Sequence, residues 1–137
     1  MITATRAKSI RIANEDPITH PQHGRVLLYM AGMKLRSGRK AAIPLTIDSQ
    51  TVRGIVGSLR NLSVIGRELF GSIQFASDKA SQVWALRWSD GFIDLANLRL
   101  DFELLDAERV PAGRSCRGEV GPFVLARSWS PTCVIIK

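Results

Sequence analysis

Short apolar segments separated by glycine and polar turn residues make up most of this chain, and a single segment has helical periodicity. Two neighbouring apolar segments, residues 53–65 and 68–76, are separated by Gly66, a pattern typical of a β-hairpin. Bends or bulges of the kind that a curved sheet needs are predicted at three further glycines, Gly54, Gly57 and Gly71. We therefore expect a mainly β (α+β) protein, a small β-barrel or strongly curved sheet with one principal helix.

The segment at residues 95–105 alternates clearly between apolar and polar positions, as a strand with one buried face does. One predicted face carries Leu98, Leu100, Phe102 and Leu104, and the other carries Asn97, Arg99, Asp101 and Glu103. Residues 106–121 are rich in Gly, Arg, Pro and Ser and predict a long loop. The remaining predicted strands cover residues 7–13, 25–33, 41–48, 122–127 and 132–136.

The helix is predicted at residues 77–89. Ser77 can cap its start, Asp78 suits the positive end of the helix dipole, and Asp90-Gly91 ends it. Four side chains form one apolar stripe with helical spacing, namely Ala80, Val83, Trp84 and Trp88. We expect the two tryptophans to belong to the core.

The chain length of 137 residues suits one domain with a substantial core, which we divide into an N-terminal arm, residues 1–24, and a barrel, residues 25–137. No apolar run approaches the ~20 residues that a membrane helix needs. The first residues also lack the apolar core of a signal peptide. We expect a protein that is made and used in a cytoplasm and does not contact membranes.

Positive charge is concentrated at residues 34–40, within a chain of net charge +7. A solvated turn is the simplest interpretation of this segment. As a binding surface, it favours an acidic protein over nucleic acid, because Tyr29 is the only nearby aromatic residue for stacking on bases. The residues predicted to bind are Lys34, Arg36, Arg39 and Lys40.

The residues that could carry chemistry are few. The two cysteines, Cys116 and Cys133, are expected to be buried or free thiols, with metal binding or a disulfide as alternatives. For His20 and His23 we favour a role in a turn or cap, with a metal pair or an unusually placed base as alternatives. An ion-paired outer face is favoured over a metal or acid-base site for four clustered acids, Asp101, Glu103, Asp106 and Glu108. No phosphate loop, zinc spacing or calcium loop is present in the sequence, so we expect neither a cofactor nor a metal.

Residues 42–137 resemble the prohead (capsid maturation) proteases of tailed phages in the order and spacing of their motifs. The resemblance rests on Leu45-Thr46-Ile47-Asp48, Phe70-Gly71-Ser72-Ile73-Gln74-Phe75-Ala76, Gln82-Val83-Trp84, Asp90-Gly91-Phe92 and Ser128-Trp129-Ser130-Pro131. It implies a prohead-protease-like fold and recognition of capsid or scaffold chains.

The same resemblance implies that the catalytic residues are missing. Ser49 stands where the family has its catalytic His, Asn97 where it has its nucleophilic Ser, and Cys133 where it has a supporting Glu. No His lies between residues 24 and 137, and a serine protease needs a base within reach of its nucleophile. The expectation is a pseudo-protease, not an enzyme.

The function we expect is that of a non-catalytic structural protein of the phage head, assembled in the host cytoplasm and located in the virion. Its partner would be the major capsid protein or another head protein, which it would bind as a decoration, cement or assembly component. Self-association is left open. The alternative is an active maturation protease with a rearranged site, cutting scaffold and capsid chains.

Overall fold

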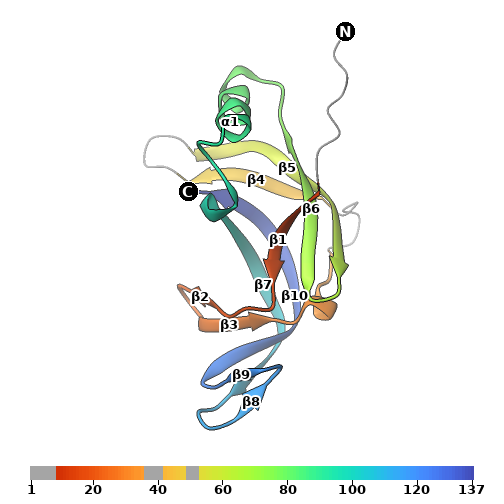
Figure 1. Cartoon of the computed structure of the whole chain (residues 1–137), viewed down its shortest axis with the longest axis vertical. Helices are drawn as coiled ribbons and strands as arrows, with labels where there is room; N and C mark the ends of the chain where they lie inside the picture. Colours follow the sequence, from red (N-terminus) through yellow and green to blue (C-terminus); the bar gives the residue numbers. More distant parts are fainter. Residues whose placement is uncertain (1–8, 36–41, 49–52) are drawn as a thin grey trace.

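The fold is mainly β, with one α-helix and a strongly curled sheet that forms a half-barrel (Figure 1). The computed structural model describes residues 9–35, 42–48 and 53–137. The prediction of a mainly β chain with a strongly curved sheet and one principal helix is confirmed.

The sheet is built from strands of very different length. The strands are β1 Ser9–Asn14, β2 Ile18–His20, β3 Gly24–Leu28, β4 Ile43–Asp48, β5 Arg53–Ile65, β6 Glu68–Phe75, β7 Leu98–Val110, β8 Ser115–Cys116, β9 Glu119–Val120 and β10 Phe123–Ile136. The helices are α1 Lys79–Ser89 and two short 3-10 turns, η1 Met30–Gly32 and η2 Leu95–Asn97. The predicted N-terminal arm therefore contributes β1 and β2 to the sheet in its described part.

Strand β10 is the centre of the sheet. The strand order is β1-β6-β5-β4-β10-β3-β2, and β7 also pairs with β10. The first half of β10 pairs in parallel with β3 and its second half in parallel with β4, while β7 runs antiparallel along its whole length. Strands β5 and β6 form the predicted hairpin, with Gly66 at a φ of 63° in its turn, where glycine avoids steric strain.

The core lies on the concave side of the half-barrel around Trp129. This side chain is 0% exposed, its Nε1–H donates to the carbonyl of Tyr29 at 2.8 Å, and its ring meets Phe102 edge-on. Apolar residues of every long strand pack around it, including Leu28, Leu45, Leu59, Leu69 and Val134. The predicted alternation of β7 is confirmed, since Phe102 is buried and Leu98, Leu100 and Leu104 pack against the same core.

The predicted long loop at residues 106–121 is wrong. Strand β7 continues to Val110, and the small β8–β9 hairpin occupies most of the rest. Residues 105–109 are exposed on both faces of β7, and pairing with β10 overrides the weak strand propensity of their charged members.

The last two predicted strands are one strand, β10, which passes through Pro131. Pro131 has no N–H to donate, and the pairing with β7 is irregular just after it, between Pro131 and Cys133. Two other strand predictions are too long. Residues 95–97 form η2, and β3 ends at Leu28 before η1.

The helix is shorter than predicted, and its buried face includes a different residue from the predicted stripe. Asp78, not Ser77, is the N-cap, and its side chain accepts from the backbone N–H of Ser81. Ser81 is the buried position of α1, whereas Ala80 and Val83 of the predicted stripe are exposed. Both tryptophans of the helix are half-buried and pack against the core, as expected.

Candidate functional site

Asn97, the residue at the expected nucleophile position, ties η2 to the end of β10. Its side-chain carbonyl accepts from the backbone N–H of Asp94 at 3.0 Å, and its amide donates to the carbonyl of Lys137 at 3.3 Å. The backbone N–H of Lys137 donates to the carbonyl of Asn97 at 2.9 Å. The polar groups of Asn97 are therefore engaged in holding two chain segments together.

The ends of β4 and β7 meet at the last residue of β10. Ile136 pairs with Ile47 on one side and with Leu98 on the other. Since neighbouring strands lie about 4.8 Å apart, Ile47 and Leu98 are roughly 10 Å apart across this corner. Ser49 itself lies outside the described residues.

Cys133 is not at this corner. It lies opposite Asp101 in the β7–β10 pair. Asn97 instead lies just before Leu98, whose partner Ile136 is the last residue of β10. Burial raises the pKa of the Cys133 thiol, which keeps it protonated and a poor nucleophile at neutral pH.

Of the four cations predicted to bind a partner, the structure describes Lys34. Its side chain is exposed, and its backbone N–H donates to the carbonyl of Trp129 at 2.8 Å. The start of the basic segment is therefore anchored to the central strand. Arg36, Arg39 and Lys40 lie outside the described residues.

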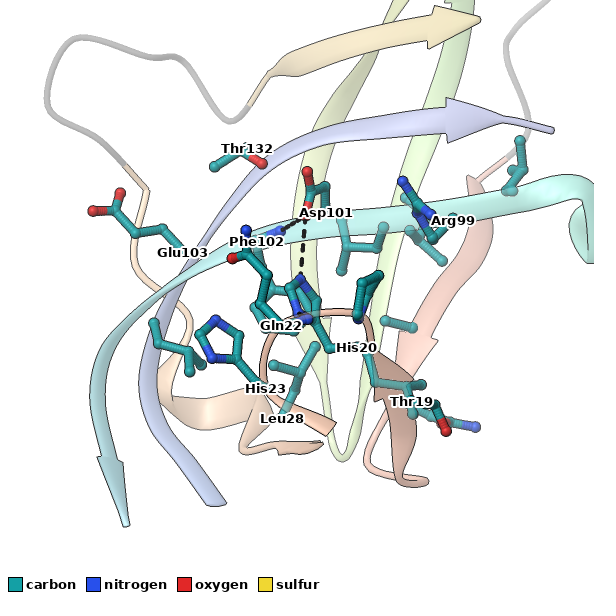
Figure 2. Close-up of a pocket in the computed structure, with 18 of the residues that line it drawn as sticks. Thr19, His20, Gln22, His23, Leu28, Arg99, Asp101, Phe102, Glu103 and Thr132 are labelled. Atoms are coloured by element: carbon teal, nitrogen blue, oxygen red, sulfur yellow. Dashed lines mark hydrogen bonds and ion pairs between the residues drawn. The ribbon is translucent and has the colours of Figure 1, made fainter. Parts of the chain in front are cut away.

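A cleft of about 820 Å³ lies between β1, the β2–β3 turn and β7 (Figure 2). Its volume lies within the ~300–1,000 Å³ typical of ligand sites. Apolar side chains from β1, β3 and β7 line it, together with a polar group formed by His20, His23 and Asp101.

His20 joins the β2–β3 turn to β7. Its Nδ1 accepts from the backbone N–H of Gln22 at 3.1 Å, and its Nε2 lies 3.8 Å from Oδ1 of Asp101 (Figure 2). The ring stacks on His23 at 4.6 Å between centroids and lies 5.2 Å from the ring of Phe102. The imidazole side chain is 14% exposed.

This geometry bears on what His20 can do chemically. With the Nδ1 lone pair used by Gln22, the proton of the neutral ring belongs on Nε2, facing Asp101. Neither nitrogen is then free to take a proton from a nucleophile. The local turn role expected for His20 is confirmed by the bond to Gln22. Within the described ranges, no three His, Cys, Asp or Glu side chains are grouped so as to hold a metal ion.

The pairing of His20 with Asp101 could not be anticipated from local patterns, since 81 positions separate the two residues in the sequence. The predicted ion-paired face of β7 is borne out at one of its acids, Glu108. Asp101 faces His20, and Glu108 pairs with Arg127.

Comparison with known proteins finds no family model, no curated protein and no solved structure that matches this chain. Among the described residues, no helix is long and apolar enough to cross a membrane.

Proposed function

We propose that this chain is a non-catalytic head protein of a tailed phage, built on a prohead-protease-like fold and binding capsid protein as a decoration, cement or assembly component. The observation that carries the proposal is the corner at Ile136. The resemblance pairs position 49, just after β4, with position 97, just before β7, and the described ends of these two strands flank the same residue of β10.

Asn97 at that corner and Cys133 farther along the same strand pair suit a binding protein better than an enzyme. Asn97 uses its amide to hold the end of β10 in place. Cys133 is kept as a thiol by burial and lies away from Asn97 along the strands. Such a fold retains surfaces for recognising capsid and scaffold chains after the reactive groups are gone.

The basic segment supplies the proposed contact with an acidic surface of the capsid protein. We expect replacement of Lys34, Arg36, Arg39 and Lys40 by Ser to weaken association with particles. Raised salt should have the same effect, because exposed charges are screened over about 8 Å at physiological ionic strength. Co-sedimentation with purified heads, at several salt concentrations, measures both.

A matched control removes the same amount of charge elsewhere. Arg60, Lys79, Arg109 and Arg114 are exposed, and replacing them by Ser also lowers the net charge by four, from +7 to +3. Particle binding should survive in this control. Equal loss in both variants would mean that total charge, not the segment, decides binding. Loss of DNA affinity with unchanged capsid affinity would instead favour a nucleic-acid partner.

The alternative function is an active maturation protease with a rearranged site. The pair formed by His20 and Asp101 beside the cleft is the observation in its favour.

A further inference from the structure

The cleft is walled by the edges of two strands. Seven consecutive residues of β7, 98–104, line it, as do four consecutive residues of β1, 11–14. Successive side chains of a strand point to opposite faces of the sheet, so one face alone would contribute every second residue. Unbroken runs of lining residues mean that the cleft follows the edge of each strand.

Both edges lack a strand partner in the described part of the chain. There β7 pairs with β10 on one side, and β1 pairs with β6 on one side. The backbone N–H and C=O groups on the other side of each strand are therefore not used in strand pairing there, although the N–H of Phe102 donates to Oδ1 of Asp101 at 3.0 Å. Such edges are templates on which another chain can add a strand.

The two edges are also compatible in direction. Strand β10 is antiparallel to β7 and parallel to β4, and three antiparallel pairings lead from β4 through β5 and β6 to β1. Strands β7 and β1 therefore run the same way. Part of β1 approaches β7 to within 8 Å between Cα atoms, less than the roughly 10 Å that an intervening strand needs, so an added strand would pair with β7 alone and be antiparallel to it.

The side chains along β7 indicate which sequence a strand added at its edge should have. Leu98, Leu100, Phe102 and Leu104 give one side of the added strand an apolar surface. On the other side lie, in order, Arg99, Asp101 and Glu103. Opposite charges directly across a strand pair contribute roughly 0.2–1 kcal/mol, and like charges oppose pairing.

We propose that the cleft binds an extended segment of another protein as an additional strand on β7. The segment carries apolar residues at alternate positions, basic residues opposite Asp101 and Glu103, and an acidic residue opposite Arg99. This inference does not depend on the basic segment at residues 34–40, so the two proposals can fail separately.

The probe is a fluorescein-labelled peptide, Val-Lys-Val-Lys-Val-Glu-Val, written to lie antiparallel to residues 104–98. Fluorescence anisotropy with the full chain should show saturable binding. A copy N-methylated at alternate backbone amides should bind at least tenfold more weakly. Hydrogen exchange should show that the peptide protects those amides of residues 98–104 that are not already bonded to β10 or to Asp101, which a ligand that only fills the cleft would not do.

Charge reversal tests the register. Glu103→Lys should weaken binding about fivefold to tenfold, and a peptide with Glu opposite this position should recover it. Asp106→Lys is the matched control, because Asp106 is exposed on the same strand beyond the cleft lining. It should bind the original peptide like the parent.

Three results would overturn the proposal. One is the absence of saturable binding up to about 1 mM peptide. Another is equal binding of the N-methylated copy. The third is protection of residues 98–104 in the free protein that disappears on dilution, which would show that a second copy of the chain covers this edge.

Discussion

Glu15 is a buried carboxylate that joins three parts of the chain. Its side chain is 8% exposed, Oε1 accepts from Nε of Arg117 at 2.6 Å, and Oε2 accepts from the backbone N–H of Met30 at 3.0 Å. The guanidinium of Arg117 also lies 4.4 Å from the ring centre of Tyr29. The hydrogen bond to Glu15 raises the pKa of Arg117. The β8–β9 hairpin, η1 and the end of β1 are thereby held together.

Glu15→Ala should lower the free energy of unfolding by about 2–3 kcal/mol, because it leaves a partly buried guanidinium and a backbone N–H without their acceptor. Urea denaturation measures this. Glu68→Ala is the control, since Glu68 pairs with Arg11 at 3.4 Å with both side chains well exposed. Its cost should be at most about 0.5 kcal/mol. Similar costs for both variants would contradict a special role for Glu15.

Cys133 should react slowly with a disulfide reagent. Burial raises its pKa above the ordinary 9.0, so the thiolate that attacks the reagent is scarce at neutral pH. In a Cys116→Ser variant, we expect the pH profile of the reaction rate to have its midpoint above 9.0. A midpoint below 8 would mean an activated thiol and would favour the enzyme alternative.

At the scale of elements, α1 shows that tertiary contacts decide which of two neighbouring residues serves as the N-cap. Ser77 and Asp78 are both good N-cap residues, and both precede the same helical segment. The structure uses Asp78, whose side chain accepts from the N–H and the hydroxyl of Ser81. Ser81 is the buried position of the helix, so this choice turns Trp84 and Trp88 toward the core.

Asp78→Ala should lower the melting temperature, whereas Asp78→Asn and Ser77→Ala should change it little. Asn can still accept from the N–H of Ser81, and Ser77 is not the cap. The bonds from Ser81 lower the pKa of Asp78 below 3.8. The contribution of Asp78 to the stability of the fold is therefore fully present above pH 3.8. It is lost as the pH falls through the lowered pKa of Asp78.

Thermal melts followed by circular dichroism between pH 2 and 6 measure this effect. The difference between the parent and Asp78→Ala should be constant at the upper end of this range and should shrink at its lower end. A difference that stays constant down to pH 2 would contradict the assignment of the cap.

At the scale of the whole molecule, β10 connects strands that lie far apart in the sequence. It pairs with β3, β4 and β7, its end receives Asn97, and Trp129 at its middle fills the core. The cleft, in contrast, lies where the curled sheet leaves the edges of β1 and β7 unpaired in the described part. The unpaired edge of β7 is where the proposed strand would add.

We expect no peptidase activity on capsid and scaffold precursors, because both nitrogens of His20 are engaged and Cys133 is protonated at neutral pH. Gel electrophoresis after prolonged incubation checks this. Cleavage that is lost in His20→Ala, His23→Ala or Cys133→Ala, but kept in Cys116→Ser, would establish the alternative function.

The amino-acid sequence by itself determined the local elements whose signals lie within a few residues. These include the β5–β6 hairpin around Gly66, the alternation of β7 and the presence of one helix, because turn chemistry and periodicity act over short distances. Tertiary structure alone decided the rest. Pairing with a long partner extended β7 through charged residues and carried β10 through Pro131. The contact of His20 with Asp101 and the open edges of the cleft arise from strands distant in sequence, for which no local pattern carries a signal.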